Sequence, residues 1–153
     1  NNLLSLRGNG ALIAPTTPAF STKPASTQTD ISANNSYHTV VFGTEIFDQG
    51  ANFASSVFTA PVTGRYQLNV SVEMQDVDTA ATDMGLKIAT SNRDYHCQLD
   101  PNFSADLTVS HWQISVLADM DASDTAQVSF AQNGGTAQAN ITVNSTFSGY
   151  LAC

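Results

Sequence analysis

The sequence predicts an all-β protein built as a two-sheet jelly-roll sandwich, and three observations carry this prediction. Apolar and polar residues alternate with period two in several short segments, as they do when a strand buries one face. These segments recur roughly every ten residues, between polar turns. No stretch has the apolar spacing of a three-turn helix, and only 12% of the residues are charged. Hydroxyl and amide side chains on the surface are typical of such a β-sandwich.

The length of 153 residues fits a single domain. We place a head domain at residues 19–153 and interpret residues 1–18 as a linker or the end of a preceding stalk. The chain starts at Asn1 without a signal-peptide pattern, which indicates a processed form or a piece of a longer protein.

The charge balance excludes several partners. A net charge of −8 and only five Lys and Arg residues argue against nucleic acid and anionic membranes, which bind clusters of basic residues. No apolar run approaches the 18 residues of a membrane span, so we expect a soluble domain without membrane insertion.

The first half of the chain leads into one central strand. Residues 13–36 are predicted to be weakly structured, with a first edge strand at 19–21. A short strand follows at 38–42, and residues 46–50 lead into a turn. The central strand covers residues 66–74, after a short strand at Phe58, and buries Tyr66, Leu68, Val70, Val72 and Met74. Burying each of these side chains contributes roughly 1.5–3 kcal/mol. Gly64 is expected to give the backbone freedom to enter this strand.

The second half alternates in the same way. Residues 84–89 and 94–99 are predicted to form a hairpin. The alternation changes parity between residues 107 and 118, which predicts a bulge or break near His111. Further strands are predicted at 125–131, 139–143 and 147–151, with a tight turn at Asn133, Gly134 and Gly135.

Three segments resemble the C1q/tumour-necrosis-factor-like globular head. Residues 58–66, FTAPVTGRY, resemble the F-T-x-P-V-x-G-x-Y signature of that family. Residues 117–128 resemble its L-x-A-G-D-x-V segment, and residues 146–151 resemble its closing strand. Ala60 stands where many animal members carry Cys. The sequence segments VFGTEIFDQGANF and FTAPVTGRY are more similar to the C1q-like knobs of bacteriophage fibres.

The resemblance implies a ten-stranded jelly roll, a homotrimer around a threefold axis, and binding without catalysis. It makes Phe58, Gly64, Tyr66, Phe147 and Gly149 structural residues. It also implies that the loops at the far end of the domain carry out recognition.

Two acidic turns are candidates for calcium, which takes six to eight oxygen ligands. Asp119, Asp121 and Asp124 form the stronger candidate, and Asp76, Asp78 and Asp83 the weaker. Neither turn has the pattern of an EF-hand loop, so both are equally compatible with plain solvated turns. No cofactor is required, and calcium is possible.

The remaining reactive residues do not form a known catalytic motif. His38, His96 and His111 lack metal-ligand spacing, although a threefold axis could bring three copies of one histidine together. Cys97 and Cys153 either form a disulfide or are a strand thiol and a terminal thiol. We predict no enzymatic activity, while carboxylates from distant loops leave carbohydrate cleavage open.

Exposed aromatic rings are the usual platforms for sugars. Four residues are candidates: Tyr37, Tyr95, Phe103 and Trp112. Trp112 falls on an apolar strand parity and is assigned to the core, so Tyr95 and Phe103 are the predicted ligand-binding residues. Five N-x-Ser/Thr sequons are expected from this composition and do not establish glycosylation; they begin at Asn34, Asn69, Asn102, Asn140 and Asn144.

The sequence therefore predicts a trimeric receptor-binding or adhesion knob that recognises a cell-surface glycan or protein on a host. Its predicted place is the tip of a phage or viral fibre on the virion, or otherwise outside the cell. The alternative is a purely structural module that trimerises or decorates a fibre or capsid and has no ligand of its own.

Overall fold

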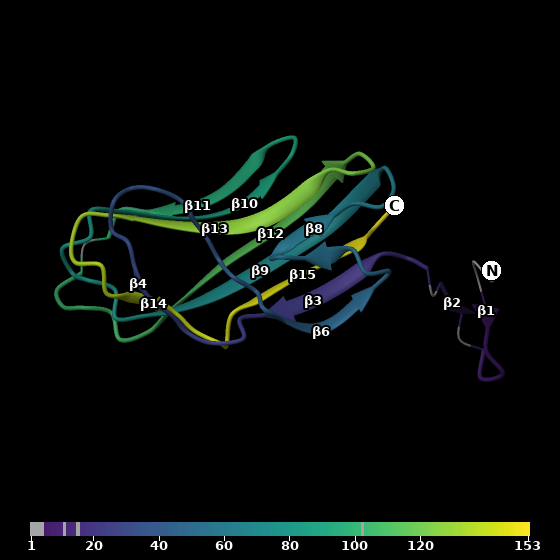
Figure 1. Ribbon diagram of the computed structural model, residues 1–153, viewed down its shortest axis with the longest axis horizontal. Helices are drawn as coiled ribbons and strands as arrows, with labels where there is room; N and C mark the ends of the chain where they lie inside the picture. The colour runs from purple at the N-terminus through teal and green to yellow at the C-terminus, as the bar shows by residue number, and fades with distance from the viewer. Residues whose placement is uncertain (1–4, 11, 15, 102) are drawn as a thin grey trace.

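The computed structural model describes residues 5–10, 12–14, 16–101 and 103–153, and it confirms the predicted two-sheet sandwich (Figure 1). All strand pairs in it are antiparallel. The six-stranded sheet has the order β11 (Asp94–Leu99), β10 (Asp83–Thr90), β13 (Thr125–Asn133), β8 (Val57–Thr59) and β7 (Phe53–Ala54), and β5 (His38–Thr39) also pairs with β13.

The seven-stranded sheet forms the second layer. Its order is β4 (Gln28–Ile31), β14 (Ala139–Ile141), β9 (Gly64–Gln75), β15 (Thr146–Leu151), β3 (Ala19–Lys23) and β6 (Thr44–Gln49), and β12 (Ser110–Met120) pairs with the other edge of β9. A separate two-stranded hairpin, β1 (Ser5–Leu6) and β2 (Leu12–Ile13), lies outside the sandwich (Figure 1). The family resemblance implies ten strands, whereas the two described sheets of the sandwich together contain thirteen. The number is higher because short segments such as β5 and β7 are counted as separate strands.

The central strand is β9, as the alternation predicted. Its five inward side chains are 0–3% exposed, and they are Tyr66, Leu68, Val70, Val72 and Met74. The strand pairs with β12 along one edge and with β14 and β15 along the other. This position fixes which side chains of β9 face the core and which face outward.

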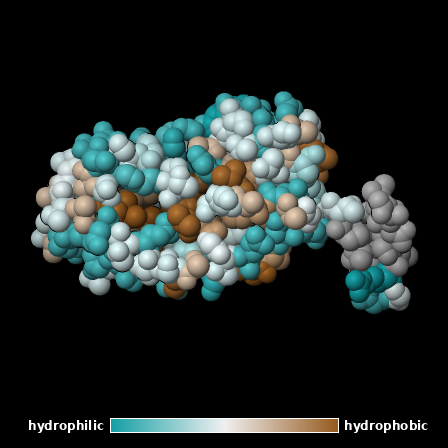
Figure 2. Space-filling view, in the orientation of Figure 1, coloured by the Kyte–Doolittle hydropathy of each residue, from teal (hydrophilic) through white to brown (hydrophobic). Residues whose placement is uncertain are grey.

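Aromatic rings fill the space between the sheets. Phe20 of β3 stacks on Phe58 of β8 with ring centroids 4.7 Å apart, and it meets Phe53 and Phe147 at 5.1 and 5.0 Å. Aromatic pairs in these geometries add stability beyond the area that they bury. In the orientation of Figure 1, apolar residues gather along the middle of the molecule, between hydrophilic margins (Figure 2).

The two ends of the sandwich differ. At one end, which we call the base, the Leu151 amide donates to the Pro18 carbonyl at 3.0 Å and the Arg65 amide donates to the Cys153 carbonyl at 2.7 Å. The C-terminus lies at this end (Figure 1). The opposite end, which we call the apex, carries the connections 76–82, 103–109 and 134–138.

Two predictions for the first half of the chain were wrong in detail. The strand predicted at an edge, β3, lies inside its sheet between β15 and β6. The segment assigned as weakly structured contains β4. Residues 46–50 lead into a turn as predicted, and most of them belong to β6. β6 was not recognised as a strand because its outward residues are not consistently polar: Ile46 and Phe47 are both more than half exposed.

Of the predicted bulge or break near His111, the structure shows a break and no bulge, because β12 begins only at Ser110. β12 pairs with β9 in one uninterrupted register from Ser110 to Met120. The change of parity instead arises because Leu107 lies in the preceding loop, where it forms an isolated bridge with Val77. Trp112 is 7% exposed, which confirms its assignment to the core.

Glycines are required at two places in the fold, for different reasons. Gly64 does not need a positive φ; a side chain there would instead meet the Cys153 carbonyl oxygen at 2.8 Å. The predicted role of backbone freedom was therefore wrong. Gly134 and Gly135 do adopt φ values of 71° and 74°, which suits the tight turn predicted there. That turn carries the chain from β13 in one sheet to β14 in the other.

Candidate functional site

The outward side of the seven-stranded sheet is the candidate interaction site. On β9, the alternation that buries Tyr66 and Val72 turns Gln67, Asn69 and Ser71 outward. On β12, Gln113, Ser115 and Leu117 point to the same side because each pairs with one of these residues. We call this surface the uncharged face and define it by Phe47, Gln67, Asn69, Ser71, Gln113, Ser115, Leu117, Thr146, Ser148 and Tyr150.

The polar side chains in the middle of the uncharged face bind one another. The Ser115 hydroxyl donates to Asn69 Oδ1 at 2.8 Å, and Gln67 Nε2 donates to Ser115 Oγ at 3.0 Å. Gln67 Nε2 also lies 3.2 Å from Asn69 Oδ1. This network orders the amides and hydroxyls and leaves them in a fixed arrangement on the surface.

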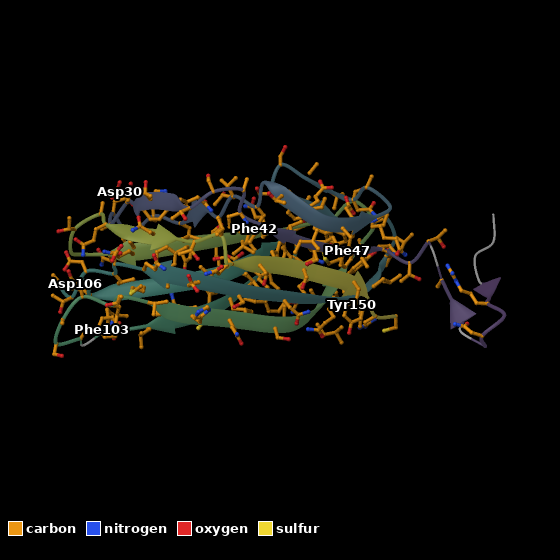
Figure 3. The ribbon with its side chains drawn as sticks, turned by 90° about the horizontal axis from the view of Figure 1, so that it is seen from below. Asp30, Phe42, Phe47, Phe103, Asp106 and Tyr150 are labelled. Carbon is orange, nitrogen blue, oxygen red and sulfur yellow. The ribbon has the colours of Figure 1, made fainter. Side chains whose placement is uncertain are left out.

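Large apolar side chains lie beside this network. Phe47 is 51% exposed, Leu117 53% and Tyr150 49%. Phe47 and Tyr150 line one shallow hollow together with Ser21, Asn69 and Ser148, and Figure 3 shows both labelled residues on the half of the sheet nearer the base. Exposed apolar groups without charged neighbours are typical of protein interfaces, whose centres are depleted of charge.

Charged groups border the uncharged face at both of its ends. Toward the base, Arg93 Nη2 and Asp119 Oδ1 form an ion pair at 3.0 Å. Toward the apex, His111 Nε2 lies 3.1 Å from Glu73 Oε2, across a directly opposed β9–β12 pair. The charges therefore lie at the rim of the surface.

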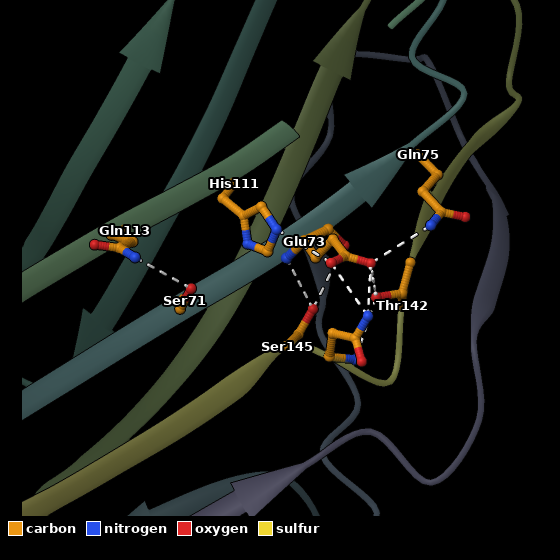
Figure 4. Close-up of polar contacts among 8 residues, drawn as sticks. Ser71, Glu73, Gln75, His111, Gln113, Thr142 and Ser145 are labelled. Carbon is orange, nitrogen blue, oxygen red and sulfur yellow. Dashed lines mark hydrogen bonds and ion pairs between the residues drawn. The ribbon is translucent and has the colours of Figure 1, made fainter. Parts of the chain in front are cut away.

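Glu73 is a buried carboxylate with a full set of donors (Figure 4). Its Oε1 accepts the Thr142 hydroxyl at 2.7 Å and Asn144 Nδ2 at 3.0 Å, and the Gln75 amide lies at 3.4 Å. These hydrogen bonds from Thr142 and Asn144, with a smaller contribution from His111, lower the pKa of Glu73 below its usual value although burial opposes them. Glu73 thus fastens the turn at 142–145 to β9.

The predicted calcium residues lie at the base, on the same side of the molecule as the C-terminus. Asp119 binds Arg93, Asp121 Oδ1 accepts the Thr63 hydroxyl at 3.3 Å, and Asp124 Oδ2 accepts the Asp121 amide at 2.8 Å. In the part of the chain that the structure describes, no group of three His, Cys, Asp or Glu side chains is arranged to hold a metal ion. Calcium binding at this turn stays a prediction.

The weaker acidic group lies at the apex. Asp78 Oδ1 accepts the Ala80 amide at 2.7 Å and Oδ2 accepts the Thr136 amide at 2.6 Å, and these hydrogen bonds lower the pKa of Asp78. Asp76 accepts the Asn140 amide at 2.9 Å. These carboxylates hold the apical turns in shape.

The two predicted ligand-binding aromatics lie at opposite ends. Tyr95 is on β11 near the base, while Phe103 lies at the apex (Figure 3), where its carbonyl accepts the Thr79 hydroxyl at 2.9 Å. Both are half-buried and pack against the core. The structure does not bring them together, and their role in ligand binding stays a prediction.

The three histidines and the two cysteines, all of them described residues, do not lie together at one site. His38 contacts Asn34, His96 contacts Tyr37, and His111 contacts Glu73. Cys97 is half-buried on β11 and Cys153 is exposed, and both are free thiols. Of the sequons, the one at Asn102 begins outside the described residues.

The Glu73–His111 pair and the uncharged face were missed by the sequence analysis. A signal was available: no charged residue occurs among the outward residues of β9 between Arg65 and Glu73. The pairing of β9 with β12, which unites the two uncharged stretches, could not be read from either strand alone.

Comparison with known protein families identifies the family to which this chain belongs. Residues 19–152 match the C1q domain family. The chain belongs to the C1q domain family. Domains of this family are generally trimeric and ligand-binding, are typically non-enzymatic, and are typically found outside the cell. The described part of this C1q domain holds no helix with the length and apolarity that a membrane crossing requires.

Solved structures support the fold. The globular domain of zebrafish complement 1qA protein is 15% identical with a TM-score of 0.60, covering 90% of this chain and 98% of that one. Murine APRIL at pH 8.0 is 14% identical with a TM-score of 0.61, covering 88% and 98%. A search of curated protein sequences found no match. At these identities, the two structures show a shared C1q/tumour-necrosis-factor-like fold.

Proposed function

We propose that this C1q domain is a homotrimeric head that recognises a host cell-surface glycan or protein at the tip of a phage or viral fibre. The observation that carries the assembly part is the uncharged face. A surface with three half-exposed apolar side chains and no charge except at its rim resembles an interface more than a solvated sheet. The acidic net charge keeps an exposed head soluble.

The orientation of the head follows from the base and the apex. The chain enters the sandwich at the base, where the Pro18 carbonyl accepts the Leu151 amide, and a fibre shaft would join there. The apex then lies farthest from the shaft, and the outer side of the six-stranded sheet faces outward. Both surfaces are free to contact a host cell. Weak single sites are sufficient here, because three copies on one stem gain avidity from their high effective concentration.

Two sequence segments support the assignment to a fibre. The segments VFGTEIFDQGANF and FTAPVTGRY resemble C1q-like knobs of bacteriophage fibres, and Ala60 replaces the cysteine common in animal members. The alternative role is a cap that trimerises a fibre or decorates a capsid without a ligand of its own.

Light scattering on the purified domain tests the assembly. We expect a mass near three chains, and we expect Leu117→Glu to weaken association by roughly 100-fold, because like charges placed together in an interface cost several kcal/mol. Val41→Glu is the matched control: Val41 has the same 53% exposure but lies beside the six-stranded sheet, with Val40 bonded to Val128. A monomeric wild type, or equal effects of the two substitutions, would contradict the proposal.

Binding of the fluorescently labelled trimer to a panel of bacterial strains tests recognition. Saturable binding to some strains, competed by unlabelled trimer, is the expected result. A well-formed trimer that binds none of them would favour the structural alternative.

A further inference from the structure

One aromatic side chain, Tyr37, lies across the outer side of the six-stranded sheet. It comes from the segment just before β5 and passes over β10 and β11. A Cβ atom on Gly85 would lie 2.5 Å from the Tyr37 hydroxyl and 3.3 Å from its Cζ, so the ring occupies the space that the glycine leaves. Tyr37 was one of the four candidate aromatic residues in the sequence, but its contact with Gly85 becomes visible only in the fold.

Tyr37 is held in place by three contacts. Its hydroxyl lies 3.2 Å from His96 Nδ1, and the His96 ring meets the Tyr37 ring edge-on at 5.9 Å. Lys87 Nζ lies 4.4 Å from the ring centroid, a cation–π geometry. The Lys87 side chain is only 17% exposed although it points outward from β10, which fits a ring that covers it.

A carboxylate completes this unit. Asp94 Oδ2 binds Lys87 Nζ at 2.8 Å and lies 3.8 Å from His96 Nε2. Both contacts use Oδ2, so among the described residues the Oδ1 atom of Asp94 has no hydrogen-bond partner. We call Tyr37, Lys87, Asp94 and His96 the Tyr37 platform. Tyr37 itself remains 37% exposed.

We propose that the Tyr37 platform binds a neutral hexopyranose. A flat aromatic surface packs against the C–H face of a pyranose ring, and a preordered ring loses little entropy on binding. Asp94 Oδ1 is an acceptor for a sugar hydroxyl, and His96 offers a ring nitrogen at the same edge. An acidic sugar is disfavoured because Asp94 already balances the charge of Lys87 on a chain of net charge −8.

The location of the platform agrees with the proposed function, which this inference deepens by naming the ligand class and its site. Gly85 is the third residue of β10, whose first residue, Asp83, lies next to the apical connection 76–82. The platform therefore lies on the outer side of the six-stranded sheet, between Gly85 near the apex and Asp94 near the base. It belongs to the sheet opposite the uncharged face, so a trimer built through that face leaves the platform open.

Saturation-transfer NMR on the trimer tests the proposal with three probes: methyl β-D-galactopyranoside, methyl β-D-glucopyranoside and the methyl glycoside of N-acetylneuraminic acid. We expect at least one neutral probe to bind with a dissociation constant on the order of 1–10 mM, and the acidic probe to bind more weakly. Tyr37→Ala should weaken neutral binding by roughly tenfold, and Val41→Ala, at an exposed residue outside the platform, should leave it unchanged.

Gly85→Ala provides a second variant that keeps the tyrosine but displaces its ring. The same loss of sugar binding is expected, with the mass by light scattering still near three chains. Absence of binding by both neutral probes, or equal binding by wild type and Tyr37→Ala, would overturn the inference. Those outcomes leave the proposed function standing if the trimer forms and binds cells, whereas a monomeric wild type would defeat the proposed function itself.

Discussion

At the scale of single residues, Glu73 shows how an acidic side chain can be buried in a β-sheet. Removing a carboxylate from water is costly unless hydrogen bonds replace the lost solvation. Thr142 and Asn144 supply those bonds from the turn that follows β14, and His111 Nε2 of β12 lies 3.1 Å from the other carboxylate oxygen. The carboxylate thereby ties three parts of the seven-stranded sheet together.

This arrangement predicts a dependence on pH. The pKa of Glu73 is lowered in the folded protein, so its contribution to stability is complete above the ordinary glutamate pKa of about 4.3 and is lost as the pH falls through the lower, folded value. Glu73→Gln should therefore reduce the free energy of unfolding at about pH 7, and the gap to the wild type should narrow by about pH 3. Urea denaturation at both pH values measures it.

Glu45→Gln is the control for this prediction. Glu45 is the other glutamate of the chain and is exposed on β6, so its substitution should change stability little at either pH. If Glu73→Gln lowered stability equally at both pH values, the charge of Glu73 would not be the cause.

At the scale of elements, the strands that bury one regular face could be predicted from the sequence. β9, β10, β11 and β13 all follow from simple alternation. β3 and β6 were misjudged because their outward side belongs to the uncharged face or its border, where Phe47 is as exposed as a polar residue would be. Alternation thus predicts a strand such as β9, whose outward residues are polar, and fails for β6, whose outward residues include exposed apolar side chains.

The candidate sites depend on pairings between elements, which the sequence does not display. Tyr37 meets Gly85 and His96 only because β5, β10 and β11 lie in one sheet. The aspartates at 119–124 could be found as a cluster, but their engagement by Arg93, Thr63 and Asn92 could not.

That engagement leads to a prediction about calcium. Because Asp119 and Asp124 already bind Arg93 and Asn92 of the connection between β10 and β11, neither EDTA nor added calcium should change the melting temperature of the purified domain. Differential scanning calorimetry with EDTA and then with added calcium measures this. A rise with calcium that Asp121→Asn removes would instead establish the turn as a calcium site, and Asp30→Asn, an exposed aspartate on β4, is the control.

At the scale of the whole molecule, the sandwich separates its surfaces by chemistry. The side of the seven-stranded sheet carries amides, hydroxyls and apolar groups, with ion pairs only at its rim. The side of the six-stranded sheet carries the ordered Tyr37, Lys87, Asp94 and His96. Assembly and recognition, as proposed, therefore use opposite sides and need not compete.

An uncharged interface makes the assembly insensitive to salt. Salt weakens contacts between exposed charges, whose range shrinks from about 30 Å at 0.01 M to about 3 Å at 1 M, but it has little effect on hydrogen-bonded amides and buried apolar groups. We therefore expect the trimer–monomer equilibrium, measured by sedimentation equilibrium, to change little between about 0.05 and 0.5 M sodium chloride. Marked weakening over this range would mean that contacts between charged groups of different chains hold the trimer together, and that the uncharged face is not the centre of the interface.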